Sequence, residues 1–238
     1  MKIVIFASGK GGVGKSLVSA STAIELKRRG HEVGLLDLDL HGPTQHILFP
    51  SSGRPEATRE GLKPFLSPQG VKLFSLGYIF KDSPLPIKGK EKYGMVQDLT
   101  WLLDWGDIDY LIVDLPPGTG DEHLACIRAF KTASLYLVSL PSLHSISVVH
   151  RAYSLFKDEG HNPEGVILNM CWLKIDGRKI YLFGKEYKKV MRERGMEIVA
   201  ELPFDPLLSK APLKRSNSGY WRRISKLVAE IIARANRS

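Results

Sequence analysis

The amino-acid sequence predicts an α/β fold, with a doubly wound, mostly parallel sheet and helices on both of its faces. Apolar runs of strand length alternate with helical patterns along most of the chain, as repeated strand–helix–strand units require. A glycine-rich turn joins the first apolar run, Ile3–Ala7, to a helical segment that stops at Gly30. The length of 238 residues fits one domain, or one domain with an insertion, and no internal repeat is found.

Each element follows from its local pattern. Strands are predicted where β-branched and large apolar residues cluster, near residues 2–7, 32–37, 71–76, 109–114, 134–140, 165–170 and 196–201. Helices are predicted near residues 15–29, 93–105, 121–131, 144–158, 184–194 and 219–236. Two stretches interrupt this alternation, at residues 50–68 and 83–92. They are rich in Ser, Gly, Pro and charge, and we expect flexible surface loops there.

The amino-acid composition indicates which broad class of protein this chain belongs to. Hydrophobic residues make up 43% of the chain and charged residues 25%, which is typical of a soluble globular protein. No apolar run approaches the length of a membrane span, and no signal or transit peptide is recognised, so we expect a cytoplasmic protein. Two cysteines far apart in sequence, Cys126 and Cys171, fit a reducing compartment. The net charge of +9 is scattered without aromatic interleaving, and nucleic acid is not an expected partner.

The glycine-rich turn predicts a phosphate-binding loop. Its residues are Gly9, Lys10, Gly11, Gly12, Val13, Gly14, Lys15 and Ser16, followed by Leu17, and they fit the spacing G-x-x-x-x-G-K-[ST]. Backbone N–H groups of such a loop surround phosphate oxygens at a helix N-terminus. Lys15 is then expected to reach the β- and γ-phosphates, and the Ser16 hydroxyl to bind Mg²⁺.

Carboxylates at two strand ends are expected to complete the site. Asp37 and Asp39 close one strand on a shared face, and Asp114 ends the hydrophobic run Tyr110–Val113, the Walker B arrangement. Ligands bind at the carboxyl ends of strands in open α/β sheets, so these side chains should meet the loop. A strand-end aspartate is also a common turn former or helix cap, which is the alternative for each of them alone.

The chain resembles a known family over nearly its whole length. The loop, with its extra Lys10, is similar to that of the deviant P-loop ATPases, the group of MinD, ParA, Mrp and the nitrogenase iron protein. Residues 109–121, Asp-Tyr-Leu-Ile-Val-Asp-Leu-Pro-Pro-Gly-Thr-Gly-Asp, resemble the Walker B and switch II segment of Mrp-type ATPases. Residues 37–44 resemble their switch I, and residues 165–170, 181–184 and 202–206 also fit.

This resemblance implies the remaining roles. Lys10 would reach across a dimer to the nucleotide of the partner subunit, although an exposed lysine in a flexible loop is the alternative. Asp39 would orient the attacking water, and Asp37 and Asp114 would hold Mg²⁺ through water. Asn169 and the turn at Pro203, Phe204 and Asp205 would hold the base of ATP or ADP.

The chain departs from the family at its metal motif. Iron–sulfur carriers of this family place a C-P-x-C motif shortly after the Asn-Met pair, and this chain has only Cys171 and then a basic turn. No stable Fe–S cluster is therefore expected. His41, His46, His123 and Cys171 could form a transient Ni²⁺ or Zn²⁺ site across a dimer, although isolated residues of these types are more often packing residues.

The function predicted from these observations is a slow, Mg²⁺-dependent ATPase that works as a nucleotide-gated homodimer. We expect it to deliver nickel in NiFe-hydrogenase maturation, by docking with a metal-carrying maturation protein or an apo-metalloenzyme. The alternatives are an Fe–S cluster assembly ATPase, a positioning ATPase cycling on a membrane or DNA, and a regulator that only senses ATP and ADP. The basic amphipathic C-terminal segment, residues 219–236, could anchor to a membrane, but docking onto the sheet is favoured, so no stable membrane association is expected.

Overall fold

A computed structural model describes residues 1–39, 42–50, 56–59, 61–80, 94, 98–99 and 102–237. Within these residues, an eight-stranded sheet has the strand order β12-β9-β8-β1-β7-β2-β6-β5. Its strands are β1 (Lys2–Ser8), β2 (Val33–Asp37), β5 (Phe65–Leu66), β6 (Lys72–Ser75), β7 (Tyr110–Pro117), β8 (Ser134–Ser139), β9 (Gly165–Leu168) and β12 (Ile198–Glu201). Every neighbouring pair is parallel except β5 and β6. The predicted α/β class with a mostly parallel sheet is confirmed.

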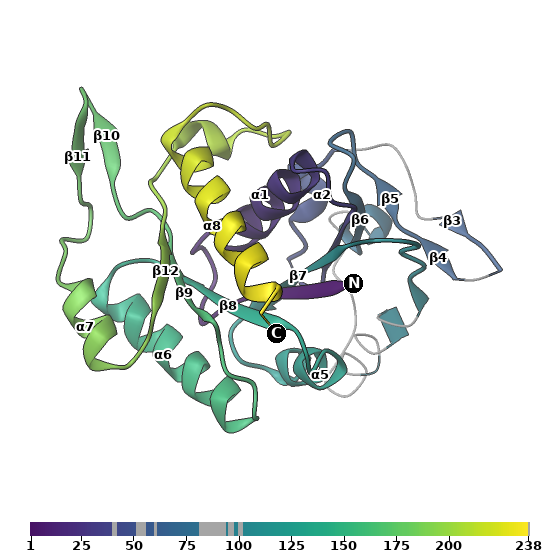
Figure 1. Cartoon of the computed structure of the whole chain (residues 1–238), viewed down its shortest axis with the longest axis horizontal. Coiled ribbons are helices and arrows are strands. Elements are labelled where there is room, and N and C mark those ends of the chain that lie inside the picture. Colours follow the sequence, from purple (N-terminus) through teal and green to yellow (C-terminus); the bar gives the residue numbers. More distant parts are fainter. Residues whose placement is uncertain are drawn as a thin grey trace.

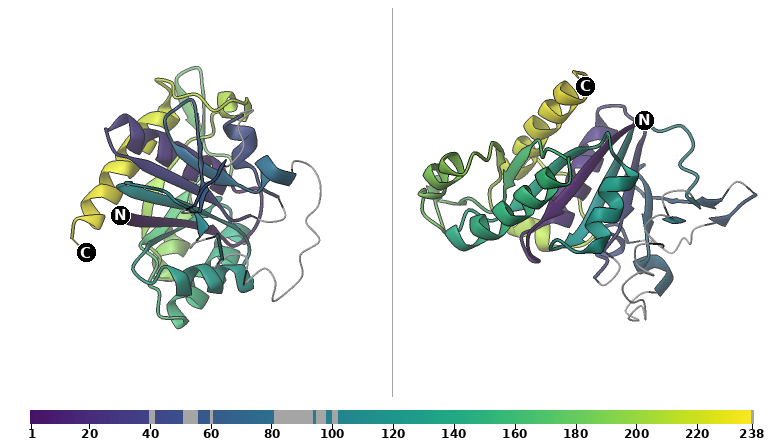
Figure 2. Two further views of the ribbon diagram at one scale, coloured as in Figure 1. Left: turned by 90° about the vertical axis from the view of Figure 1, so that its right-hand side faces the viewer. Right: turned by 90° about the horizontal axis from the view of Figure 1, so that it is seen from below.

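Helices cover both faces of the sheet (Figure 1; Figure 2, left). The helices α1 (Lys15–Arg28) and α8 (Gly219–Ala235) cover one face, and α5 (Asp121–Ala129), α6 (Leu143–Asp158) and α7 (Tyr187–Glu193) cover the other. The central strand β1 explains the two layers. Val4 and Phe6 pack in the first core, whereas Ile5 and Ala7 pack in the second, because successive side chains of a strand point to opposite faces.

The C-terminal helix α8 docks on the body of the protein. Its buried side chains recur at helical spacing and pack with α1: Tyr220, Trp221, Ile224, Leu227, Val228 and Ile231. Arg234 near its end forms ion pairs with Glu164, Glu197 and Glu230. The docking expectation is therefore confirmed. In the part of the chain that the structure describes, no helix is both long and apolar enough to cross a membrane.

The structure also contains short elements that the sequence patterns miss. Three of them, β3 (Glu56–Ala57), β4 (Leu62–Lys63) and β5, lie in the stretch 50–68, which was expected to be loop. The others are α2 (Gln45–Leu48), α3 (Gly77–Phe80) and the 3-10 helix η1 (Pro206–Ser209). Elements of two to four residues are too short to show a periodicity, so tertiary contacts determine them. The predicted loop at 83–92 lies outside the described residues, and so do residues 93, 95–97 and 100–101 of the predicted helix at 93–105.

A two-stranded hairpin, β10 (Leu173–Ile175) and β11 (Arg178–Ile180), follows β9 and replaces the basic turn expected there. Its connecting residues, Asp176 and Gly177, have φ angles of 46° and 78°. Two consecutive positive φ angles fit a type I′ turn, for which Asp-Gly is a favoured pair. In Figure 1 the hairpin projects from the body of the protein beside one end of α8.

Candidate nucleotide-binding site

The glycine-rich loop connects β1 to the start of α1, as predicted. Gly12 and Gly14 adopt left-handed φ angles of 77° and 84°, which turn successive N–H groups toward one concave side. A Cβ atom added to Gly14 would lie 2.3 Å from the Asn169 side-chain nitrogen. Only glycine therefore fits at this position, at the positive end of the α1 dipole.

The loop forms a cavity of about 370 Å³. It is lined by residues 10–17, together with Asp39, Thr44 and Pro117 from the ends of neighbouring elements. The structure thus brings together the predicted phosphate residues from Lys10 to Leu17. Gly9 is the exception, because it faces α6, where an added Cβ would lie 2.9 Å from Val148.

Two buried carboxylates lie beneath the loop. Asp37 on β2 and Asp114 on β7 are register partners, and they are 1% and 0% exposed. The Lys15 ammonium lies 2.5 Å from Asp114 Oδ1 and 3.3 Å from the Ser16 hydroxyl. Parallel pairing therefore brings both predicted Mg²⁺-binding carboxylates beside the loop, where hydroxyl and carboxylate oxygens form the donor set that Mg²⁺ prefers.

Asp37 also organises the segment that follows β2. Its carboxylate accepts hydrogen bonds from the N–H groups of Asp39, Thr44 and Gln45 and from the Ser75 hydroxyl. Burial, and then the charge of Asp114, raise the pKa of Asp37 to about 7, against the opposing effect of Lys15 and the hydrogen bonds. A cation bound beside Asp37 would favour the ionised form of this carboxylate.

Asp39 lines the nucleotide cavity, unlike the buried pair. It is partly exposed, and its Oδ1 accepts a hydrogen bond of 2.9 Å from the Gly42 N–H. The structure therefore brings the Asp39 carboxylate to the cavity that the loop lines. Residues 40 and 41 lie outside the described part, and so does the candidate ligand His41.

Sequence reasoning missed two polar residues of α2 and its cap. Gln45 is fully buried, and its Nε2 donates to Asp114 Oδ2 at 2.8 Å, the Ser16 carbonyl at 3.0 Å and Ser19 Oγ at 3.1 Å. The side-chain oxygens of Thr44 and Gln45 are buried and have no hydrogen-bond partner among the described residues. Such orphaned oxygens beside Ser16 and Asp39 fit a site that a hydrated cation completes.

A second, smaller cavity of about 130 Å³ adjoins the first through Leu17. All the residues predicted to hold the base line it, namely Asn169, Pro203, Phe204 and Asp205. Asn169 Nδ2 donates to the Val13 carbonyl at 2.9 Å, which links the end of β9 to the phosphate loop. The structure therefore brings the base residues together beside the loop.

The remaining metal candidates have packing roles here. Both ring nitrogens of His123 make hydrogen bonds, with Gly120 N–H and the Pro116 carbonyl. His46 packs against Tyr78 with ring centroids 6.1 Å apart. Cys126 and Cys171 are buried, and burial raises the pKa of both thiols. Among the described residues, no three or more His, Cys, Asp or Glu side chains are grouped so as to hold a metal ion.

Three features define a P-loop nucleotide-binding protein: the doubly wound sheet, the glycine loop at the start of α1, and the paired carboxylates of Asp37 at the end of β2 and Asp114 within β7. The chain belongs to the NUBPL iron-transfer P-loop NTPases of the ParA class, whose family model matches residues 1–232. The predicted Mrp/MinD-type resemblance is thereby confirmed at the level of the family.

Relatives of this family cover most of the chain. An iron–sulfur cluster carrier protein of Saccharolobus solfataricus is 33% identical over 211 residues, covering 86% of this chain and 71% of that protein. The cytosolic Fe–S cluster assembly factor NUBP2 of Rattus norvegicus is 32% identical, with 88% and 81% covered. The chain spans only 58% of the Aquifex aeolicus carrier, to which it is 32% identical.

Solved structures agree with this placement. A nucleotide-binding protein from Archaeoglobus fulgidus, in complex with ADP and described with cobalt, has a TM-score of 0.74 and 30% identity, covering 95% of this chain and 86% of that one. MinD from Pyrococcus horikoshii with Mg-ADP has a TM-score of 0.70, with 99% and 98% covered, but only 17% identity, so it supports the fold alone. The names of these relatives refer to iron–sulfur clusters and nucleotides, and not to hydrogenase maturation.

Proposed function

We propose that this protein is a Mg²⁺-dependent ATPase that forms a homodimer when ATP is bound. The observation that carries the proposal is that the loop and Asp39 line one cavity next to a base pocket, with the buried Asp37–Asp114 pair held beside the loop by Lys15. Mg²⁺, when bound, would neutralise phosphate charge and fix the geometry of the β- and γ-phosphates. Ser16 would hold it directly, and Asp37 and Asp114 through water.

The other residues act on the nucleotide and on water. The loop N–H groups and Lys15 bind the phosphates, and Asn169 with Pro203–Asp205 holds the base. Asp39 orients the attacking water. Lys10 lines the cavity and is partly exposed, so its ammonium is available to a γ-phosphate in a facing subunit. ATP, and not ADP, should therefore promote the dimer, which light scattering of the purified chain with each nucleotide would measure.

For the cellular role, we propose an assembly factor for iron–sulfur proteins. The names of the carrier and NUBP2 relatives support this alternative over the nickel interpretation. The chain's own thiols argue that it works beside a separate cluster-carrying protein or apo-protein client, because both are buried and Cys171 is followed by the β10–β11 hairpin. The name of the rat relative also supports a cytoplasmic location.

Deleting the gene distinguishes the iron–sulfur role from the nickel role. Several Fe–S enzymes should lose activity, and added nickel should not restore them. A complementing copy with Asp39→Ala should fail where the wild-type copy succeeds. Loss confined to a nickel enzyme and rescued by nickel would reject the iron–sulfur role. The purified chain, reconstituted anaerobically with iron and sulfide, should show no visible absorption of a 4Fe–4S cluster, and a retained cluster would reject the separate-carrier arrangement.

A further inference from the structure

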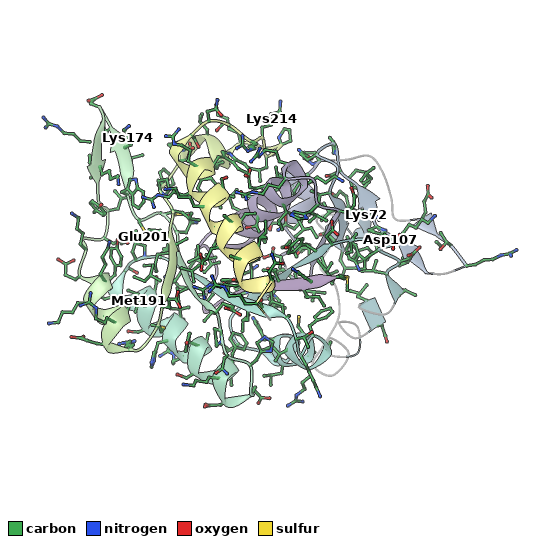
Figure 3. All side chains as sticks on the ribbon, in the orientation of Figure 1. Lys72, Asp107, Lys174, Met191, Glu201 and Lys214 are labelled. Carbon is green, nitrogen blue, oxygen red and sulfur yellow. The ribbon has the colours of Figure 1, made fainter. Side chains whose placement is uncertain are left out.

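A cavity larger than the nucleotide cavity lies outside the nucleotide site. It has a volume of about 510 Å³ and lies between the β10–β11 hairpin, the segment Pro203–Pro206 and the start of α8. Five cations line it: Lys174 and Lys179 from the hairpin, and Arg222, Arg223 and Lys226 from α8. We call this cavity the basic pocket. Figure 3 shows Lys174 on the hairpin, which stands beside α8.

Several cations of the basic pocket lie close enough to repel one another. Lys174 and Lys179 are directly opposed in the hairpin register and share one face, where like charges are destabilising. Arg222 and Lys226 are four residues apart on α8, which is also unfavourable for like charges. Lys179 and Arg223 both lie over the Trp172 ring, at 4.5 and 5.4 Å from its centroid. The Trp172 ring therefore stabilises Lys179 and Arg223 through cation–π contacts, whereas no such contact is found for Lys174, Arg222 or Lys226 among the described residues.

The chain supplies little negative charge to neutralise them. Within the described residues, none of the five cations forms an ion pair with a carboxylate. Asp205 is the one acidic residue that lines the pocket in this part of the chain, and its Oδ1 accepts the Leu207 N–H at the start of η1. The described residues therefore leave the pocket with an excess of positive charge.

We propose that the basic pocket binds an acidic peptide segment of a partner protein. Two arginines and three lysines spread over two elements match carboxylates repeated along a chain, and arginine forks pair with carboxylates in a bidentate way. Single-stranded nucleic acid fits less well, because it needs exposed rings for stacking. Of the rings that line the pocket in the described part of the chain, Phe204 is 38% exposed and offers one stacking surface. Trp172 and Tyr220 are only 6% and 1% exposed, and the Trp172 ring already contacts Lys179 and Arg223.

The basic pocket shares a wall with the base cavity. Pro203, Phe204, Asp205 and Tyr220 line both. A peptide in the basic pocket therefore contacts the segment that is proposed to hold the base. Any difference in peptide affinity between the ATP and ADP states must be matched by an equal effect of the peptide on nucleotide affinity. This step rests on the proposed function, and it identifies the acidic segment as the docking element of the assembly partner.

The test uses the full chain and a fluorescein-labelled octaglutamate peptide, with binding followed by fluorescence anisotropy. The double variant Lys174→Glu with Lys226→Glu should weaken binding by about tenfold or more. Both residues are exposed, and neither contacts the Trp172 ring. The matched control is Lys131→Glu with Lys157→Glu, which makes the same change in net charge at exposed positions that do not line the pocket. It should bind the peptide as the wild type does.

Equal loss in the test and control variants, or no loss in either, would overturn the proposal, since binding would then follow net charge alone or take place elsewhere. Tighter binding of a single-stranded oligonucleotide of the same charge would also overturn it. The proposed ATPase is scored separately, because Lys174→Glu with Lys226→Glu should leave ATP hydrolysis without peptide unchanged. A wild-type chain that binds the peptide but does not hydrolyse ATP would reject the ATPase and leave the peptide site standing.

Discussion

The nucleotide site and the basic pocket differ in how their charged side chains are compensated. In the first, the carboxylates of Asp37 and Asp114 are buried and supported by Lys15, Gln45 and backbone N–H groups. In the second, five cations on partly or fully exposed side chains line a cavity with one carboxylate. Buried charges need partners in their own chain, whereas exposed charges can remain solvated until a ligand arrives. The fold itself therefore compensates the charges of the nucleotide site, whereas the charges of the basic pocket are left for solvent or a ligand.

The strongest test of the nucleotide site is Asp39→Ala. If Asp39 orients the attacking water, single-turnover ATP hydrolysis should fall by about two to four orders of magnitude. ATP affinity should change little, because Asp39 lies on the cavity wall and the loop carries the phosphate contacts. Lys15→Ala is the informative control, since it should weaken ATP binding itself. Hydrolysis by Asp39→Ala at the wild-type rate would reject its role.

A smaller effect is expected for Lys10→Ala, about a hundredfold on hydrolysis with nucleotide affinity nearly intact. Mixing subunits tests whether Lys10 acts across the dimer. A Lys10→Ala subunit keeps its own Asp39, and an Asp39→Ala subunit can lend it Lys10, so their mixture should regain activity that neither variant has alone. If Lys10 acts within its own subunit, the mixture stays inactive.

Gln45 tests whether the buried carboxylates depend on neighbours that no motif reveals. Gln45→Leu leaves Asp114 Oδ2 without its 2.8 Å donor, and the free energy of unfolding should fall by about 1–3 kcal/mol. Gln69→Leu is the matched control, because the Gln69 amide donates at 3.2 Å to the neutral Leu213 carbonyl, and it should cost less. Urea denaturation of both variants measures the difference. Equal costs would show that Gln45 does not support the Asp114 charge.

These residues also show how far the sequence alone could predict the molecule. The loop from Lys10 to Leu17 is contiguous, and Asp37 and Asp114 follow apolar runs on adjacent strands, so spacing and sequence pattern were enough to predict that they lie beside the loop. The predicted strand end at Asp114 was wrong, because β7 continues to Pro117. Gln45 was missed because its role arises from contacts of a four-residue helix with residues distant in the sequence. The basic pocket was missed for the same reason, because its cations on the hairpin and on α8 are far apart in the sequence and meet only in the folded chain. The Asp176-Gly177 pair was, however, a signal for the hairpin.

The smallest predicted effect concerns Glu25, whose carboxylate neutralises a cluster of three arginines of the same chain. Its fully buried carboxylate pairs with Arg28, Arg29 and Arg215. Burial alone would raise the pKa of Glu25, but hydrogen bonds from Arg28, Arg215 and Ser225 lower it to about 2. A lowered pKa means that the folded state favours the ionised form. The stabilisation is then present above the ordinary value of 4.5 and is lost as pH falls toward 2.

Glu25→Gln should therefore lower the free energy of unfolding by about 1 kcal/mol at neutral pH, because the three arginines are partly exposed and water can solvate them. The difference from the wild type should shrink as pH falls from about 5 toward 2, when Glu25 of the wild type also becomes neutral. Urea denaturation across this range measures it. A difference that stays constant with pH would mean that the Glu25 charge is not what holds these arginines. In the basic pocket, by contrast, substitution of the cations should change ligand binding and leave the free energy of unfolding nearly unchanged. A constant difference for Glu25→Gln would mean that the two regions do not differ in this way.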